Sequence, residues 1–558
     1  MRQLLINLSL IIGYLTFSPC AADAQPAWVK KASKSVFTLK TFAADGSLIG
    51  SSNGFFVGPQ GEAVSSFTPF KGAVRALVID ASGKELSVTG IMGADETYDV
   101  AKFRVAGKTQ PIAVAQTVAA EGSTAWLLPF RDTKNVECGQ IRKAENFQDG
   151  YAYYTVAIRM TEQAVSCPLI SDAGEVIGLM QPAASAADTL CYAVSARYAD
   201  SLRVSGLSVN SPALRMTNIK TELPDNLQDA SLMLFMAGGT ADSAAYVPLV
   251  NDFISKFPTA PDGYTFRAQF AAAHGDFAAA GRDMEEAIKL SDPKDNAHFN
   301  YARMIYNKEI YQSQLPYDGW TLDKALTEVR LAIEGNPLPA YRQLEGNVLF
   351  AQQKYAEACD IFLPLTKTNL DKAEMWFAAA RCKEMLKDTT AMLALLDSTM
   401  ATFSKPYLKQ AAPYLWTRAN ARMDAGKYRD AVSDMNDYEQ LMGADVNARF
   451  YYIRHQAEVG GHLYQQALND IERAVNMEPR ETLYYAEKAS LQIRVGHYDE
   501  AITTARECIA IDAELSDGYL FLGLAQCLKG NKAEGIANLR KAGELGDPQA
   551  QHLIEKYK

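Results

Sequence analysis

Residues 516–542 read SDGYLFLGLAQCLKGNKAEGIANLRKA, and this stretch shows how the second half of the chain is built. Small residues stand at Gly523, Gly535 and Ala542, and Gly530 separates two runs of helical composition. Two antiparallel helices pack closely where small side chains let their backbones approach, and a glycine allows the chain to reverse between them. The stretch therefore predicts a helix, a turn and a second helix.

Similar units recur through the second half of the chain. Small residues follow one another at intervals of 45, 33, 33, 40, 36, 34 and 34 residues, at Ala280, Ala325, Ala358, Ala391, Ala431, Ala467, Ala501 and Gly535. A glycine with an aromatic residue two positions later precedes several of them, as in Gly426-Lys427-Tyr428 and Gly496-His497-Tyr498. A sustained period near 34 residues indicates stacked helical units. We expect about nine units, with an insertion around Tyr311–Trp320.

The first half of the chain has a different pattern. Short runs of β-type composition occur at Ser35–Phe42, Gly54–Gly58, Arg75–Asp80, Tyr151–Met160, Glu175–Met180 and Leu190–Ala196. Turn residues such as Ser82-Gly83 and Asp172-Ala173-Gly174 separate these runs. This alternation predicts an antiparallel barrel or sandwich. Residues 206–225, rich in Ser, Asn, Pro and Thr, are expected to form a linker.

Composition limits the classes of function. The 558 residues exceed one ordinary core, and the 48% hydrophobic and 22% charged residues are typical of folded proteins. The net charge of −10 opposes the phosphate backbone of nucleic acids, and the chain has no concentrated stripe of Lys and Arg. We therefore expect no nucleic-acid partner.

The N-terminus predicts export. Arg2 is followed by an apolar run from Leu4 to Phe17 and then by Ala22-Asp23-Ala24, which is the order of a signal peptide cleaved after residue 24. The apolar run is shorter than the about 20 residues of a membrane span, and no later candidate follows. We expect a periplasmic or extracellular protein with no transmembrane segment in the mature chain. Cys20 leaves a lipoprotein as an alternative, although Pro19 stands where a lipobox has a small residue.

The cysteines give no indication of a metal or a cofactor. Cleavage would leave seven cysteines, with no CxxC pair and no Cys/His cluster at zinc spacing. We expect buried thiols that act as small apolar side chains. Disulfides between Cys359 and Cys382, or between Cys508 and Cys527, are the alternative in an oxidising compartment.

Residue by residue, the second half resembles the tetratricopeptide repeat family. In the last unit the residues at family positions are Tyr519, Leu522, Gly523, Gly530, Gly535 and Ala542. The resemblance implies a superhelix whose concave side binds a protein or an extended peptide. The inward positions of the family correspond here to Trp416, Asn420, Arg449, Tyr452, Gln456, Ser490 and Arg494. Alternatively, Trp416 and Tyr452 pack between helices. The family's repeated Lys and Asn carboxylate clamp is not evident, which disfavours a chaperone C-terminal tail as the ligand.

The first half resembles bacterial trypsin-like proteases of the high-temperature-requirement type in the order of its motifs. The matching segments are Ser51-Ser52-Asn53-Gly54-Phe55-Phe56-Val57, Ala63-Val64-Ser65-Ser66-Phe67-Thr68-Pro69, Asp95-Glu96-Thr97-Tyr98-Asp99-Val100-Ala101 and Gln163-Ala164-Val165-Ser166-Cys167-Pro168-Leu169. Together the two resemblances imply an all-β trypsin-like double barrel, degenerate in its catalytic residues, followed by an all-α tetratricopeptide repeat superhelix. The expected domains are a signal peptide at 1–24, the pseudopeptidase domain at 25–205, the linker at 206–225 and the repeat array at 226–558.

The resemblance also shows where this chain departs from the protease pattern. Thr68 stands at the position of the catalytic histidine, Asp99 at that of the aspartate and Val165 at that of the nucleophilic serine. Gln163 replaces the glycine whose N–H helps to form the oxyanion hole. The first histidine of the chain is His274, so no change of alignment places an imidazole in this domain. Serine hydrolysis requires a base and preorganised oxyanion donors, and we therefore predict no catalytic residues.

Two residues near these positions, Ser166 and Cys167, are candidate remnants of activity. Ser166 adjoins the vacated nucleophile position, and Lys71 is a candidate for its base, although a solvated lysine is protonated near neutral pH. Cys167 is a candidate thiol nucleophile, but it also lacks a base and is expected to be buried. Asp99, with no histidine to orient, is expected to serve as a turn or capping residue.

The sequence thus favours an exported scaffold or adaptor that binds a protein or peptide partner through its repeats. One alternative is a secreted serine peptidase with a non-standard active site that recruits substrate through the repeats. The other is a structural component of an envelope assembly.

Overall fold

The computed structural model describes residues 25–558, apart from residues 135, 149, 183–189 and 240–242. The predicted signal peptide at 1–24 lies outside the described residues. The chain divides into two compact units, one that ends at Leu290 and one that spans Ser291–Lys558. The first contains all the named strands and the first helix pairs, and the second is helical.

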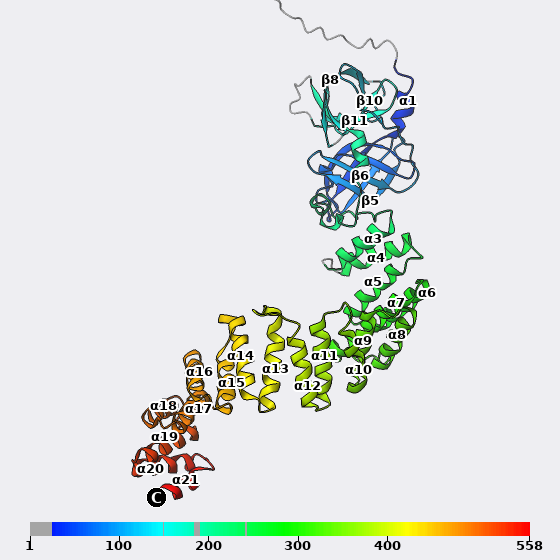
Figure 1. Ribbon diagram of the computed structural model, residues 1–558. Helices are drawn as coiled ribbons and strands as arrows, with labels where there is room; N and C mark the ends of the chain where they lie inside the picture. The colour runs from blue at the N-terminus through cyan, green and yellow to red at the C-terminus, as the bar shows by residue number, and fades with distance from the viewer. Residues whose placement is uncertain (1–24, 135, 149, 183–189, 240–242) are drawn as a thin grey trace, which may run out of the picture. The chain divides into compact units, whose positions relative to one another are not determined.

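Two closed six-stranded antiparallel barrels form the first part of the chain (Figure 1). Barrel 1 has the order β1-β2-β3-β6-β5-β4, and barrel 2 has the order β10-β11-β12-β9-β8-β7. The strands of barrel 1 are β1 (Val36–Phe42), β2 (Leu48–Phe56), β3 (Glu62–Ser65), β4 (Arg75–Ile79), β5 (Glu85–Asp95) and β6 (Val100–Val105). Those of barrel 2 are β7 (Thr124–Leu127), β8 (Glu137–Phe147), β9 (Tyr151–Ala157), β10 (Pro168–Ser171), β11 (Val176–Met180) and β12 (Cys191–Ser195). The predicted double barrel is confirmed.

Alternating side chains fill the barrels. In β9, every second residue from Ala152 to Val156 is buried, as expected for a strand with one face in a core. Phe37, Phe70 and Phe103 lie in the core of barrel 1. A further cluster contains residues of both barrels, among them Val36, Phe55, Val64, Ile170, Leu179 and Val194. Gly54 of β2 has no room for a side chain, because a Cβ there would lie 2.4 Å from the carbonyl oxygen of Val64.

Residues 206–225, expected as a linker, are packed against barrel 1. Ala213, in the short helix α2 (Pro212–Arg215), and Ile219 belong to the core cluster of that barrel. The N–H of Ile91 in β5 donates to the carbonyl of Lys220 at 2.8 Å. The division between compact units falls after Leu290, within the predicted repeat array. Polar composition was therefore a poor guide here, because a few apolar residues attach the segment to the barrel.

Antiparallel helix pairs make up the rest of the described chain. The first compact unit holds α3 (Leu227–Gly238), α4 (Ser243–Lys256), α5 (Pro261–Ala273) and α6 (Phe277–Leu290). The second holds α7 (Asp295–Tyr311), α8 (Leu322–Gly335), α9 (Pro339–Ala351), α10 (Tyr355–Leu365), α11 (Lys372–Met385), α12 (Thr389–Met400), α13 (Ala412–Asp424), α14 (Tyr428–Met442), α15 (Ala448–Gly460), α16 (Tyr464–Met477), α17 (Thr482–Arg494), α18 (Tyr498–Ile511), α19 (Ser516–Lys529), α20 (Lys532–Glu544) and α21 (Ala550–Tyr557). Among the described residues this gives nine pairs and a final helix, in agreement with the predicted repeats.

The periodic small residues lie on the second helix of each pair. Those at Ala280, Ala325, Ala358, Ala431, Ala467, Ala501 and Gly535 are buried, and Ala391 is half-buried. In the last pair, a Cβ on Gly535 would lie 2.7 Å from the carbonyl oxygen of Gly523. The two backbones therefore approach each other where the sequence placed two glycines, and a larger side chain at either position would force α19 and α20 apart.

Five of the described cysteines behave as buried apolar side chains, whereas Cys138 is disulfide-bonded. Cys167, Cys359, Cys382, Cys508 and Cys527 are buried free thiols, and buried Cys191 contacts the carbonyl oxygen of Ile158. The alternative disulfides, Cys359 with Cys382 and Cys508 with Cys527, are therefore not present. Within the described part of the chain, no helix is both long and apolar enough to cross a membrane.

Candidate functional site

The residues at the histidine and aspartate positions of the protease pattern contact each other. Thr68 begins a short 3-10 turn after β3, and Asp99 immediately precedes β6 with a positive φ of 50°. One oxygen of the Asp99 carboxylate accepts hydrogen bonds from the N–H of Thr68 at 2.6 Å and from its hydroxyl at 2.8 Å. Asp99 thus caps the turn that starts at Thr68, which is the turn or capping role expected from the sequence.

The loop at the nucleophile position is satisfied by its own hydrogen bonds. Residues Glu162–Ala164 form a 3-10 turn, and the N–H of Val165 donates to the carbonyl of Glu162 at 3.3 Å. In an active serine protease the N–H of the nucleophile residue helps to bind the oxyanion. Here that N–H is directed to a neighbouring carbonyl instead.

Asn53 of barrel 1 joins this loop of barrel 2. Its amide nitrogen donates to the carbonyl of Gln163 at 2.7 Å and to that of Val165 at 3.1 Å. Its amide oxygen accepts from the hydroxyl of Thr38 at 3.1 Å. The sequence placed Asn53 in a strand motif but gave no sign of this role, because its partners lie 110 and 112 residues further along the chain.

Ser166 is sealed in the core. Its side chain has no exposed surface, and its hydroxyl donates to that of Ser66 at 2.9 Å. Its N–H donates to the carbonyl of Met180 at 2.9 Å, and its φ of 62° lies in the left-handed region. The hydroxyl is therefore neither open to solvent nor paired with a base.

The groups that could have activated a nucleophile are engaged elsewhere. Lys71 forms an ion pair with Glu96 at 2.8 Å near the surface. His274 is exposed at the end of α5, and its ring contacts the ring and the carbonyl of Phe270. Burial raises the pKa of the Cys167 thiol to about 12, so at neutral pH it stays protonated and is a poor nucleophile.

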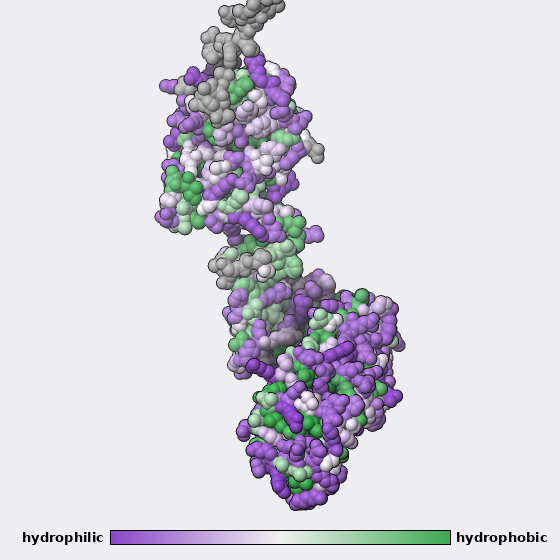
Figure 2. Space-filling model, turned by 90° about the vertical axis from the view of Figure 1, so that its left-hand side faces the viewer, coloured by the Kyte–Doolittle hydropathy of each residue, from purple (hydrophilic) through white to green (hydrophobic). Residues whose placement is uncertain are grey.

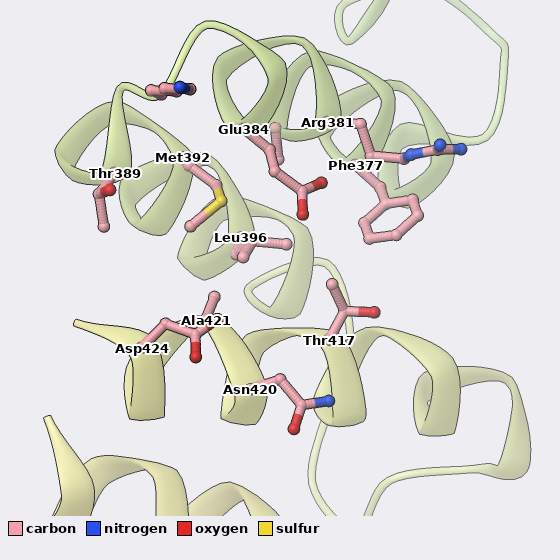
Figure 3. Close-up of a pocket in the computed structure, with 12 residues that line it drawn as sticks. Phe377, Arg381, Glu384, Thr389, Met392, Leu396, Thr417, Asn420, Ala421 and Asp424 are labelled. Carbon is pink, nitrogen blue, oxygen red and sulfur yellow. The ribbon is translucent and has the colours of Figure 1, made fainter. Parts of the chain in front are cut away.

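A pocket opens between α11, α12 and α13 in the helical unit (Figure 3). Its volume is about 430 Å³. Phe377, Met392 and Leu396 supply apolar walls, and Thr417 and Asn420 of α13 lie across from them. Charged groups at the rim are Arg381, Glu384, Lys387 and Asp424. An apolar interior with a polar rim suits a side chain of a partner protein.

A second pocket adjoins it on the other side of α13. Its volume is about 480 Å³, and it is lined by Trp416, Asn420, Tyr438, Asp445, Val446, Asn447, Arg449, Phe450 and Ile453. The rings of Trp416, Tyr438 and Phe450 lie within 5.3–5.9 Å of one another, centroid to centroid, and form one apolar wall. Asn420 lines both pockets, so the two form a continuous surface, which we call the α13 groove.

Three of the seven predicted binding residues meet in the α13 groove: Trp416, Asn420 and Arg449. Trp416 is half-buried and Arg449 is exposed. Among the described residues, the side chains of Asn420 and Arg449 have no hydrogen-bond or ion-pair partner. They are therefore available to a ligand.

The other four predicted residues lie outside the two pockets. Tyr452 accepts a hydrogen bond from Gln456 one turn later on α15 at 2.8 Å, and its ring contacts that of Tyr484. Ser490 is half-buried and Arg494 is exposed, both on α17. The structure thus places Tyr452 between helices, as the packing alternative for that residue required.

Sequence reasoning missed the pocket residues of α11 and α12. Phe377 and Arg381 precede Trp416 and Asn420 by 39 residues and occupy corresponding places on their helix. The interval differs from 34 because the segment between α12 and α13 is longer than in other units. Aligning the first helices of successive units directly would have found them.

The described chain consists of two closed six-stranded antiparallel barrels followed by antiparallel helix pairs, which is the architecture that the two resemblances implied. No family model matches the chain. Over 95 residues, or 17% of this chain, the sequence is 28% identical to small glutamine-rich tetratricopeptide repeat-containing protein 2 of Saccharomyces cerevisiae, and it spans 28% of that protein's length.

Solved structures similar to this chain include two forms of one protease. The active form of the Rv3671c protease from M. tuberculosis is 19% identical, with a TM-score of 0.30, over 37% of this chain and 90% of that chain. The inactive form of the Rv3671c protease is 20% identical, with a TM-score of 0.27, over 33% of this chain and 95% of that chain.

Proposed function

We propose that this protein is an exported interaction scaffold, in which the α13 groove binds a protein or peptide partner and the double barrel has no hydrolytic activity. The observation that carries the proposal is the pair of adjoining pockets, with the side chains of Asn420 and Arg449 lacking partners among the described residues. Aromatic walls beside a guanidinium are common at the centre of protein interfaces.

The contacts of the loop around Val165 and Ser166, which the resemblance aligns with the nucleophile loop, support a barrel without hydrolytic activity. The chain has no histidine before His274, and the hydroxyl of Ser166 is buried against Ser66. The N–H of Val165 is bonded to Glu162, and Asn53 holds the carbonyls of the same loop. Hydrolysis would need a base, an accessible hydroxyl and free oxyanion donors, and each of these requirements is opposed by a specific contact.

Site-specific photocrosslinking of the full-length chain tests the groove. A benzophenone amino acid at position 420 is expected to trap a discrete partner in cell-envelope extracts. The same group at position 433 is the control, since Ser433 is exposed on α14 and lines neither pocket. Equal trapping at both positions, or none at 420, would contradict a binding role for the groove and favour a structural role for the chain.

A fluorophosphonate probe and unfolded casein test the barrel. We expect neither labelling nor cleavage by the full-length chain. Labelling that disappears in Ser166→Ala would overturn the proposal for the barrel and favour the secreted peptidase.

A further inference from the structure

The side of α15 that packs on α14 and α16 carries a buried cluster of charges. Arg454 is 4% exposed and donates to both oxygens of Asp470, at 2.6 Å and 3.0 Å. Its remaining nitrogen donates to Glu439 at 2.6 Å and to Asn436 at 2.9 Å. Every nitrogen of this guanidinium is therefore engaged with groups of the neighbouring helices.

Glu458, one turn after Arg454, lies beside this network without joining it. Its side chain is 4% exposed, and its nearest cation is Nε of Arg454, 4.0 Å from Oε1. Within the described part of the chain, its buried Oε2 has no hydrogen-bond partner. An ionised carboxylate in such a place would lose its hydration without gaining a compensating bond.

A count of the charges in this cluster also favours a protonated Glu458. The cluster holds the guanidinium groups of Arg454 and Arg473 and the carboxyl groups of Glu439, Asp470 and Glu458. Arg473 reaches Glu439 at 3.2 Å and Asp470 at 3.6 Å. Two cations balance two carboxylates, so the cluster is neutral when Glu458 keeps its proton.

The corresponding positions in neighbouring pairs hold no acid. Arg422 stands 36 residues earlier and pairs with Asp434 at 2.8 Å. Gln492 and Gln526 stand 34 and 68 residues later, near the ends of α17 and α19. A protonated glutamic acid has nearly the shape and hydrogen-bonding capacity of glutamine. The neutral form of Glu458 therefore fits a position that the repeat fills elsewhere with a neutral or cationic side chain.

We infer that Glu458 is a proton-binding switch: α15 and α16 pack closely while Glu458 is a neutral acid, and loss of its proton loosens α15. The link to ligand binding rests on the proposed function, because α15 also carries Arg449, Phe450 and Ile453 of the α13 groove. At alkaline pH, the loosening of α15 is therefore expected to disturb the groove residues that this helix carries.

The electrostatics around Glu458 support this assignment. Burial, followed by the nearby charge of Asp470, raises the pKa of Glu458 from 4.5 to about 8. Arg454 and Arg473 act in the opposite direction, and Glu439 adds to the rise. His455, which follows Arg454 on α15, contacts the carbonyl of Ala467 and lies 3.9 Å from Glu487 of α17.

The sign of the pH effect follows from this shift. A carboxyl whose pKa is higher in the folded chain binds its proton more tightly when folded. The resulting stabilisation is fully present below a pH of 4.5 and is lost as the pH rises through about 8. The helix pair α15 and α16 is therefore expected to loosen on the alkaline side.

Hydrogen exchange on the full-length chain, without a ligand, tests the switch. Between about pH 6 and about pH 9.5, after correction for intrinsic exchange rates, the protection of α15 and α16 amides is expected to fall by about tenfold or more. Glu458→Gln should abolish this fall. Glu472→Gln is the control, because Glu472 is exposed on α16, pairs with Lys488 and lies outside the cluster, so the alkaline transition should persist in that variant.

Infrared difference spectra between the same two pH values provide a second readout. The wild-type chain is expected to lose the carbonyl band of a protonated carboxyl group, and Glu458→Gln should lack that change. An equal fall in protection in wild type and Glu458→Gln, or a wild-type spectrum without the band, would overturn the inference. Neither measurement involves a partner, so this failure would leave crosslinking at position 420 unaffected, and the reverse also holds.

Discussion

The loop around Ser166 in the barrels and the α13 groove in the helical unit differ in how their polar groups are satisfied. In the barrels, Asp99, Val165 and Ser166 direct their polar groups to other parts of the same domain. In the groove, Asn420 and Arg449 lack partners among the described residues. Polar groups that are satisfied internally stabilise a fold, whereas free ones beside apolar walls can contribute to recognition. The comparison suggests that stability and binding have been assigned to different residues.

The helix α13 carries polar residues of both kinds. Polar and charged side chains cover most of the face shown in Figure 2, and hydrophobic residues form small separate patches on it. On α13 itself, Arg418 is bonded to Asp434, whereas Trp416 and Asn420 face the groove. A single helix thus provides both kinds of residue, and substitutions along it can separate their effects.

The largest effect is expected from Arg418→Leu. Arg418 binds both oxygens of Asp434, at 2.6 Å and 3.0 Å, and Asp434 is buried. Loss of the Arg418 guanidinium removes two charge-assisted hydrogen bonds from the buried carboxylate and leaves Arg422, 2.8 Å away, as its remaining cation, which costs about 3 kcal/mol. Urea unfolding of the helical unit measures the change, and Arg418→Leu combined with Asp434→Leu should recover part of it. A loss below about 1 kcal/mol would show that this pair is not a stabilising element.

Trp416→Ala is expected to have the next largest effect, and on binding. This substitution removes one of the three rings that form the apolar wall, with Tyr438 and Phe450. Binding of the partner trapped at position 420 should weaken by about 2 kcal/mol, or about thirtyfold. Titration calorimetry with that partner measures the affinity. Trp376→Ala is a matched control, since Trp376 lies on α11 but lines neither pocket. Equal losses in both variants would mean that the effect is one of folding.

Arg449→Ala should have a smaller effect on binding. Its guanidinium is exposed at the groove rim, so we expect a loss of about 1 kcal/mol, or about fivefold, that diminishes at high salt. Unfolding should be unchanged, in contrast to Arg418→Leu. Arg480→Ala removes the same charge from an exposed position outside the pockets and should leave the affinity unaltered. A salt-independent loss at position 449 would instead indicate a packing role.

Ser166→Ala is expected to have the smallest effect. The substitution removes one hydrogen bond to Ser66 and should destabilise the barrels by about 1 kcal/mol or less. Labelling by the fluorophosphonate probe should be absent before and after the change. If the probe labels the wild-type chain and Ser166→Ala abolishes the labelling, the Ser166 hydroxyl is accessible and reactive. The contrast between the Ser166 loop and the α13 groove would then be wrong.

The fold could be predicted because it follows from repeated local patterns. Small residues such as Ala431, Ala467 and Ala501 mark the close approach of two helices in each unit, and their spacing is visible without any alignment. The runs predicted at Ser35–Phe42 and Glu175–Met180 match β1 and β11 to within one residue, whereas the run at Gly54–Gly58 covers only the end of β2.

The sites were predictable only in part, because they depend on contacts between distant residues. Trp416 and Arg449 were found by their place in the repeat, whereas Tyr452 and Gln456 bond to each other and lie outside the pocket. The contacts of Asn53 with the nucleophile loop span more than a hundred residues and have no local signature. Periodicity predicts which face of a helix a residue occupies, but it does not predict whether the polar group of that residue is hydrogen-bonded to a neighbouring side chain.

The order of contacts in the helical unit has a mechanical consequence. From α7 to α21, each helix packs chiefly against the helices just before and after it in the chain. Tension applied to the ends of such a stack is borne in series, so the weakest junction yields first while the others stay folded. A segment built this way is therefore expected to lengthen in steps under load.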